Sequence, residues 1–185
     1  MIDELNHRVK NTLSTVQSLA AQTMRDKEGD EREFERRLLA LSRVHDQLTR
    51  QAWEWADFTQ IAQDSFAPYG GTANGRVTVS GPALRLNSRT SLALAMVLHE
   101  LANNAAQHGA LSTPDGHVTL SWRVEHAKLL IDWLEQRGPA VTMPKRRGFG
   151  ARLVERAIAH ELGGRPTMDY RPAGVHCTME IPLPE

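Results

Sequence analysis

His7 is the side chain in this sequence best placed to react with another molecule, and it lies in the run Glu4-Leu5-Asn6-His7-Arg8. Residues 2–25 have the pattern of a helix, and the apolar stripe of that helix is formed by Leu5, Val9, Leu13, Val16 and Ala20. His7 lies close to the opposite side of this helix, so we expect its imidazole to face solvent. A neutral imidazole, with an unperturbed pKa of about 6.5, is a nucleophile at cellular pH.

A second group of polar residues falls on a helix predicted from about Ser88, a plausible N-cap, to Gly109. Glu100, Asn104 and His108 are spaced by four and are expected to share one face of it. The opposite face, which would pack on a sheet, carries Leu94, Leu98, Leu101 and Ala105. An asparagine carbonyl is a good ligand for Mg²⁺, and a glutamate one turn away can order a metal-bound water or take a proton. The alternative is an ordinary hydrogen-bond network between the helix and a loop.

Two further segments contain residues whose types and spacing suit them to bind a nucleotide. Glu135 ends a predicted strand just before Gly138-Pro139, where a carboxylate can accept a hydrogen bond from an adenine amino group. Trp133 is two residues earlier on the same strand face and could pack behind a base. The alternative for this segment is an ordinary strand that ends in a turn.

The second of these segments is the run from 147 to 152, which opens a predicted helix. Its glycines Gly148 and Gly150 allow backbone N–H groups to approach a phosphate, and the positive end of the helix dipole assists. The basic run Lys145-Arg146-Arg147 adds positive charge beside them. The alternative for such a run is a solvated basic loop.

Length and composition restrict the classes of protein that the chain can belong to. Its 185 residues contain 24% charged and 41% hydrophobic side chains, a balance typical of globular domains. The formal net charge of +0 argues against a nucleic-acid-binding protein. Cys177 is the only cysteine, which excludes an intrachain disulfide and a cysteine metal cage. Because no apolar run approaches about 20 residues and no signal peptide is evident, we expect a cytoplasmic chain without membrane contact.

The hydrophobic pattern divides the chain into a helical hairpin and a second domain. Residues 2–25 and 31–51 read as helices separated by a charged turn that contains Gly29. The second helix has heptad spacing, with Phe34, Leu38, Leu41, His45 and Leu48. Since two helices bury little alone, we expect a symmetric dimer that forms a four-helix bundle.

The second domain is predicted to be α+β, with helices on one face of a mostly antiparallel sheet. The predicted helices cover residues 58–66, 88–109 and 149–162. The predicted strands cover residues 76–80, 118–122, 129–133, 167–170 and 176–181, with Leu84 and Leu86 continuing after the first. The strands at 118–122 and 129–133 are expected to form an antiparallel pair.

The order of these motifs resembles the GHKL ATPase fold and, more closely, the catalytic core of an HWE-type sensor histidine kinase. The similarity extends from about residue 4 to residue 184. Its family-defining residues are His99, Trp133 and Glu135. The other matching segments are residues 5–13, His99-Glu100-Leu101-Ala102 with Asn104-Ala105, residues 108–112, Gly138-Pro139 and Gly148-Phe149-Gly150.

This resemblance implies two domains with different functions. Residues 1–52 would be a dimerisation and histidine phosphotransfer hairpin, and residues 53–185 a GHKL (Bergerat) ATP-binding domain with a mixed, mostly antiparallel sheet. His7 would be the phosphoacceptor, Asn104 the Mg²⁺ ligand and Glu135 the adenine contact. The other residues implied at the ATP site are His99, His108, Trp133, Gly138, Lys145, Arg146, Arg147, Gly148, Phe149 and Gly150. The phosphoryl group would pass from ATP to His7 and then to an aspartate on the receiver domain of a response regulator. A sensor domain would lie upstream, outside this chain.

Several positions depart from the family pattern. Many histidine kinases have an acid directly after the phosphoacceptor, whereas this chain has Arg8, so Glu4 or Glu100 is the candidate general base. Gln107 stands where related kinases often have lysine, Asn103 replaces a common threonine, and Arg137 stands where glycine is usual. The loop between Pro139 and Gly148 predicts a short lid with little order in the absence of nucleotide.

Two other functions remain as alternatives. One is a GHKL serine kinase of the anti-sigma type, and the predicted hairpin with an exposed His7 argues against it. The other is a degenerate module that binds nucleotide and a partner without transfer, and Gln107 and Arg137 keep it open.

Overall fold

The computed structural model describes residues 55–143 and 149–183. The predicted hairpin, with His7 and Glu4, lies outside the described residues, as does the boundary between the two predicted domains. Lys145, Arg146, Arg147 and Gly148 also lie outside them, so the predicted lid is described only in part.

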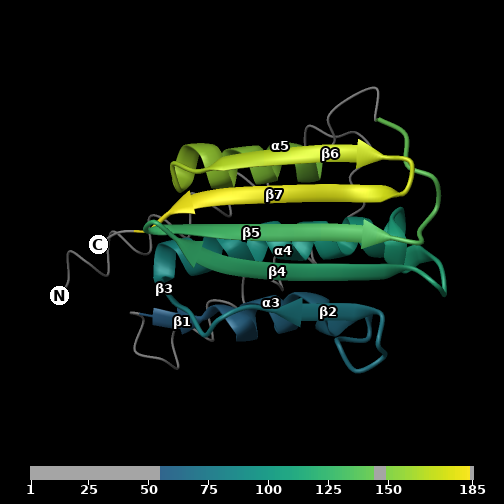
Figure 1. Ribbon diagram of the computed structural model, residues 1–185, viewed down its shortest axis with the longest axis horizontal. Helices are drawn as coiled ribbons and strands as arrows, with labels where there is room; N and C mark the ends of the chain where they lie inside the picture. The colour runs from purple at the N-terminus through teal and green to yellow at the C-terminus, as the bar shows by residue number, and fades with distance from the viewer. Residues whose placement is uncertain (1–54, 144–148, 184–185) are drawn as a thin grey trace.

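A five-stranded sheet forms one layer of the domain, and helices cover one of its faces (Figure 1). Its strands are, in spatial order, β2 (Val77–Ser80), β4 (His117–Glu125), β5 (Lys128–Gln136), β7 (Gly174–Pro182) and β6 (Arg165–Arg171). β2 runs parallel to β4, and every other neighbouring pair is antiparallel. The expected mixed, mostly antiparallel sheet is therefore confirmed. The predicted strand pair is confirmed as well, with Leu120 opposite Trp133 and Trp122 opposite Ile131.

A second, two-stranded sheet joins β1 (Trp55–Asp57) to β3 (Arg85–Asn87). The helical layer consists of α3 (Phe58–Phe66), η1 (Ala67–Tyr69), α4 (Ser88–Gln107), η2 (Ala110–Ser112), α5 (Phe149–Glu155) and η3 (Arg156–Glu161). Sequence patterns predicted the three longer helical segments, but not the short strand β1.

The start of α4 differs from the prediction by one residue. Asn87 rather than Ser88 is the N-cap, because its backbone is extended and its side chain accepts a hydrogen bond from the Thr90 amide at 2.9 Å. Such a cap satisfies one of the free N–H groups of the first turn. Asn87 also ends β3, so one residue closes the strand and starts the helix that carries much of the candidate site.

The predicted helix over 149–162 is divided in two. α5 covers its first seven residues, and a π-helical turn, η3, follows. In this wider turn the Leu162 amide donates to the Ala157 carbonyl at 3.1 Å. The helical segment ends before Gly163, where φ is +65°, close to the predicted end at residue 162.

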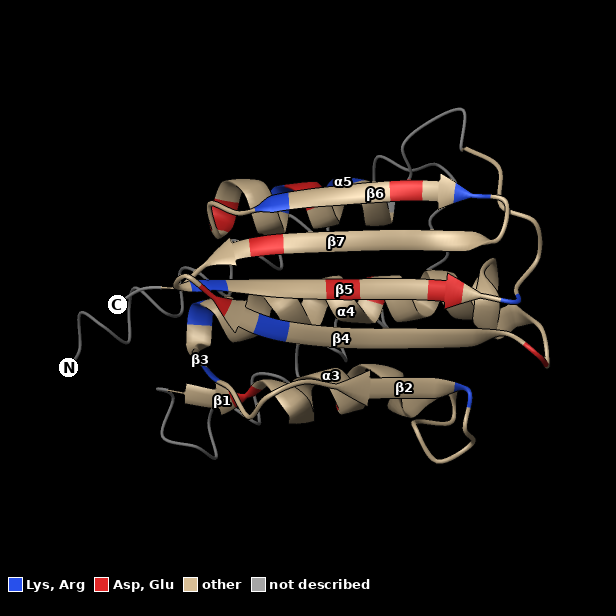
Figure 2. Ribbon diagram, viewed as in Figure 1, with Lys and Arg blue, Asp and Glu red and all other residues tan. Residues whose placement is uncertain are grey.

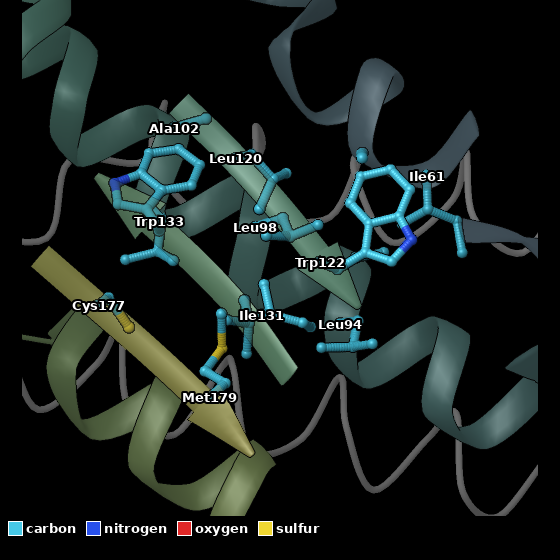
Figure 3. Packing of buried hydrophobic residues seen from close by; sticks show 14 of the residues in the cluster. Ile61, Leu94, Leu98, Ala102, Leu120, Trp122, Ile131, Trp133, Cys177 and Met179 are labelled. Atoms are coloured by element: carbon cyan, nitrogen blue, oxygen red, sulfur yellow. The ribbon is translucent and has the colours of Figure 1, made fainter. Parts of the chain in front are cut away.

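The core lies between the sheet and the helices (Figure 3). Alternate residues of β4 and β5 point into it, so that Leu120, Ile131 and Trp133 are fully buried with Leu94 and Leu98 of α4. Burial of each such side chain stabilises the fold by roughly 1.5–3 kcal/mol. The apolar face predicted for α4 is therefore confirmed.

Two aromatic pairs attach α3 to the sheet. Phe58 meets Trp122 edge to face with ring centroids 4.8 Å apart, and Phe66 stacks on Trp133 at 5.3 Å. Each pair adds roughly 0.5–1.5 kcal/mol beyond its buried area. They hold α3 against β4 and β5.

The opposite face of the sheet carries charged and polar side chains together with Leu130 and Leu134. Acidic and basic positions are interspersed over its strands without a patch of one sign (Figure 2). Two pairs link β5 to β7, namely Lys128 with Glu180 at 2.6 Å and Asp132 with His176 at 2.9 Å. Within the described part of the chain, no helix has the length and apolarity required to span a bilayer.

Candidate functional site

Two neighbouring asparagines in the C-terminal half of α4 have different surroundings, since one is buried and the other is exposed. Asn103 is 5% exposed, and its side-chain oxygen accepts hydrogen bonds from the Tyr69 hydroxyl at 3.1 Å and from the Gln107 amide at 3.2 Å. Asn104 is exposed. Asn103 and Gln107, both departures from the family pattern, are thus bonded to each other one turn apart. Asn104 keeps the accessible amide oxygen that a cation ligand needs.

Asn104 lies against the start of α5. A Cβ atom placed on Gly150 would come within 2.5 Å of the Asn104 amide nitrogen. A side chain at position 150 would therefore displace the Asn104 amide, and we refer to this approach as the α4–α5 contact. The structure therefore brings together two of the predicted site residues, which are far apart in the sequence.

The predicted common face of Glu100, Asn104 and His108 is wrong in one respect. Asn104 and His108 are exposed, but Glu100 is 3% exposed. Four residues make slightly more than one turn, so the side-chain direction rotates by about 80° between Glu100 and His108. Glu100, which has an interaction partner of its own, belongs to the buried side of α4, and the half-buried His99 lies beside it.

Glu135 is the second-last residue of β5 and lies against the chain that follows α4. Its Oε2 accepts a hydrogen bond from the Ala110 amide at 2.9 Å, and its Oε1 accepts one from the Trp133 indole N–H at 3.2 Å. Only 3% of the residue is exposed. Burial raises the pKa of this carboxyl, while the two hydrogen bonds lower it in part. The predicted shared strand face of Trp133 and Glu135 is confirmed.

Trp133 does not lie where a base could stack on it. Its exposed fraction is 0%, and its ring is covered by Phe66 with only 8° between the ring planes. The expectation that it packs directly behind a base is therefore corrected. Trp133 is a core residue whose indole N–H is bonded to Glu135, because β5 turns this face toward the helices.

Residues 109–116, which we call the 109–116 loop, are held by Arg76. The Arg76 guanidinium donates to the carbonyls of Leu111 at 2.8 Å, Thr113, and Gly116 at 3.3 Å. Sequence analysis missed Arg76, because nothing around an arginine that follows Gly75 indicates which carbonyls it will reach. Arg76 directly precedes β2, and β2 pairs with β4 just after the loop, so the topology brings it there.

The end of β5 packs against the same loop. The Thr113 hydroxyl lies 3.1 Å from the Arg137 carbonyl, and a Cβ atom on Gly138 would lie 2.6 Å from the Ala110 Cα. Arg137 has a φ of +59°, a conformation that glycine adopts more easily, which gives a reason for the family's usual glycine there. Gly138, one of the predicted site residues, is thereby required by backbone packing.

The described residues contain no cluster of three or more His, Cys, Asp or Glu that could hold a metal ion. Any cation bound near Asn104 would therefore need oxygens from another source, such as water or phosphate. This is the way in which Mg²⁺ is commonly held.

Comparisons with known proteins agree with this geometry. A family model described as HWE histidine kinase matches residues 4–83. A blue-light-activated histidine kinase of Brucella ovis is 37% identical over 97% of this chain. The match covers 38% of that relative, so the chain spans well under half of its length.

Solved structures show the same fold. The histidine kinase domain of the Erythrobacter litoralis EL346 blue-light activated histidine kinase matches with a TM-score of 0.65 at 18% identity, covering 92% of this chain and 83% of that one. Histidine kinase ThkA in complex with the response regulator protein TrrA matches with a TM-score of 0.55 at 13% identity, covering 100% and 61%. The fold is thus that of histidine kinases with a GHKL-type ATPase domain. Within them, the chain belongs to the HWE histidine kinase family.

Proposed function

We propose that this chain is the phosphotransfer core of a two-component histidine kinase. It would transfer the γ-phosphoryl group of ATP to His7 and then to an aspartate of a response regulator. In the first step a bond forms between an imidazole nitrogen and phosphorus, the bond from phosphorus to the bridging oxygen breaks, and ADP leaves. The observation that carries the proposal is the α4–α5 contact, where the exposed Asn104 meets Gly150 in a chain of the HWE family.

Mg²⁺ fits the residues at this contact. Asn104 offers one hard oxygen ligand on a rigid helix, and ATP phosphates and waters would complete the coordination. When bound, the ion neutralises phosphate charge during transfer. Because Gly150 has no side chain, the Asn104 amide has room to lie against the start of α5. Lys145, Arg146, Arg147, Gly148 and Phe149 stay predicted contacts of the phosphates, and His99 and His108 stay predicted members of the same site.

Two carboxylates are candidates for the base that accepts the imidazole proton. Burial of Glu100 in α4 argues against it, because a base must come within hydrogen-bonding reach of the imidazole. We therefore favour Glu4, one helical turn before His7. If Glu4→Gln retains full autophosphorylation while Glu100→Gln loses it at unchanged nucleotide affinity, this assignment is wrong.

The proposal also implies partners and a location. A receiver domain would accept the phosphoryl group, as the presence of a response regulator in the ThkA complex suggests. Residues 1–52 would form a four-helix bundle with a second copy of the chain. We place the reaction in the cytoplasm, which supplies ATP and where a lone cysteine stays reduced.

The test is incubation with γ-labelled ATP and Mg²⁺, followed by treatment of the labelled protein with acid. We expect an acid-labile, alkali-stable label that is lost in His7→Ala. The matched control is His160→Ala, which removes an exposed histidine from η3 and should label normally. Acid-stable label that survives His7→Ala would indicate a serine kinase. Nucleotide binding without any label would indicate a degenerate binding module.

A further inference from the structure

We propose that Gln107 supplies a second oxygen ligand to the cation proposed at Asn104, and that Asn103 is the positioning residue that holds Gln107 in place for this. The inference rests on the proposed function, because the cation is the Mg²⁺ that would arrive with ATP. It goes beyond that function by giving a ligand role to a glutamine whose position differs from the family pattern.

Gln107 lies between Asn103 and Asn104 when α4 is viewed along its axis. Successive helical residues are rotated by about 100°, so Gln107 is about 40° from Asn103 and about 60° from Asn104. Residues three apart on a helix are neighbours, with about 5–6 Å between their Cβ atoms. Asn104 and Gln107 are both exposed. Their amide groups can therefore reach one ligand from the same side of α4.

The amide nitrogen of Gln107 is already bonded within the protein. It donates to Asn103 Oδ1 at 3.2 Å, and the Tyr69 hydroxyl donates to the same oxygen at 3.1 Å. Asn103 is 5% exposed, so its oxygen is fixed between η1 and α4. Because Gln107 Nε2 points toward Asn103, Gln107 Oε1 points away from it. No residue in the described part of the chain donates a hydrogen bond to this Oε1.

The Asn104 amide has the same arrangement on the other side. A Cβ atom on Gly150 would lie 2.5 Å from Asn104 Nδ2 but 3.9 Å from Asn104 Oδ1. The nitrogen therefore faces α5, and the oxygen faces away from it. In both amides the nitrogen is turned toward the protein and the oxygen is left for a ligand. Amide oxygens are hard ligands for cations, whereas an NH₂ group can only donate.

The same contacts favour a cation over a phosphate as the group that Gln107 binds. A phosphate accepts hydrogen bonds, so it would need the Gln107 NH₂ group. Moving that group to a phosphate would break its bond to the buried Asn103 oxygen and lose the stabilisation which that bond provides. A cation needs only the free Gln107 oxygen, so it leaves the bond to Asn103 intact.

The experiment measures the dissociation constant of ATP in Mg²⁺ and in EDTA, on the full chain and on Gln107→Met. Methionine has a similar length but lacks the amide. In Mg²⁺ we expect the dissociation constant to rise by about tenfold, because one ligand of the cation is lost. In EDTA it should not change, because the Gln107 oxygen then has no cation to bind. The thermal midpoint should change little, since the side chain is exposed.

A positioning role for Asn103 predicts the same pattern from a second site. Asn103→Leu should raise the dissociation constant in Mg²⁺ by about threefold relative to that in EDTA, because Gln107 is no longer held. The double variant should bind Mg²⁺ and ATP no more weakly than Gln107→Met alone, since both substitutions act on one ligand. A merely structural role of Asn103 would instead change the two constants by the same factor.

Gln60→Met is the matched control. Gln60 is an exposed glutamine on α3, and its amide nitrogen donates to Asp64 Oδ1, four residues away, at 2.8 Å. The substitution therefore removes the same kind of hydrogen bond from a helix that carries none of the proposed ligands. Both dissociation constants should stay at their wild-type values.

Several results would overturn the inference. An unchanged ratio of the two constants in Gln107→Met would exclude Gln107 as a ligand of the cation, and an equal rise in both would show that its amide binds a phosphate. If Mg²⁺ does not strengthen ATP binding to the wild-type chain, the cation site itself is absent. If the wild-type chain binds ATP under neither condition, the proposed function fails, which separates that outcome from the others.

Discussion

The two ends of the candidate site are built in opposite ways. In the 109–116 loop, side chains and backbone satisfy one another, because Arg76 and Glu135 bind main-chain groups and Gly138 packs on the Ala110 backbone. At the α4–α5 contact, Asn104 is exposed, and the atoms nearest to a Cβ on Gly150 are those at the end of the Asn104 side chain. The difference indicates that one end provides a rigid frame and the other holds polar groups available to a ligand.

The largest expected effect comes from adding one methyl group to the rigid end. In Gly138→Ala the new Cβ would meet the backbone of Ala110 at 2.6 Å and 2.9 Å, and backbone atoms there cannot rotate away. We expect the free energy of unfolding to fall by about 3 kcal/mol. Urea denaturation of the two proteins measures it.

Gly150→Ala is the matched control at the other end. Its Cβ would meet the Asn104 amide, which can rotate away, so we expect a loss of stability below about 1 kcal/mol. Its ATP affinity should nevertheless fall, because the Asn104 side chain must move. Equal destabilisation by the two substitutions would mean that the two ends do not differ in rigidity.

Asn104→Ala should separate activity from stability. The side chain is exposed, so the thermal midpoint should change little, while loss of the proposed Mg²⁺ ligand should lower the autophosphorylation rate by about 100-fold, or about 2.7 kcal/mol. Rates measured over a series of Mg²⁺ concentrations test this. A variant with the wild-type rate and Mg²⁺ dependence would remove Asn104 from the site.

Arg76→Gln should weaken the frame without a steric clash. Glutamine cannot reach the three carbonyls that the half-buried guanidinium binds, so we expect a loss of about 2 kcal/mol in unfolding free energy and a weaker affinity for ATP. The control is Arg123→Gln, which removes an exposed ion pair with Glu125 and should cost at most about 1 kcal/mol. Identical effects of the two variants would contradict the role given to Arg76.

The smallest effect concerns pH. Burial raises the folded-state pKa of Glu135 above its ordinary value of 4.5, so the folded chain holds this proton to higher pH than the unfolded chain does. The contribution of Glu135 to the unfolding free energy is therefore greatest below pH 4.5 and declines as pH rises through the folded pKa. The difference in stability between wild type and Glu135→Gln should decline in the same direction. Denaturation curves from pH 4 upward measure it, and a difference that grows with pH would contradict the raised pKa.

Sequence patterns predicted the regular elements well, because their signals are local. The alternation of Val118, Leu120 and Trp122 and the apolar face of α4 depend only on neighbouring residues, and both are confirmed. The parallel pairing of β2 with β4 was not anticipated, since strand partners are chosen by tertiary contacts. The prediction also placed the N-cap at Ser88, where a preceding asparagine competes for the same role.

The candidate site was predictable as a set of residues but not as an arrangement. Spacing identified Asn104, Glu135, Gly138 and Gly150, yet it could not show which carboxylates are buried. Glu100 and Glu135 are both buried, Glu135 is bonded to the Ala110 amide, and Arg76 reaches carbonyls far along the chain. Such long-range contacts leave no local pattern in a single sequence.

The topology of the large sheet has a consequence for the order in which the protein folds. β4 and β5 are joined by His126 and Ala127, both with positive φ, and β6 and β7 by Pro172 and Ala173. Hairpins with such short turns form within microseconds. β2 instead pairs with β4 across a long connection that contains α4. Pairing over such a sequence separation is slow, because the loop must close first. We therefore expect the parallel strand, with Arg76 beside it, to join last, so that the 109–116 loop is completed only at the final step of folding.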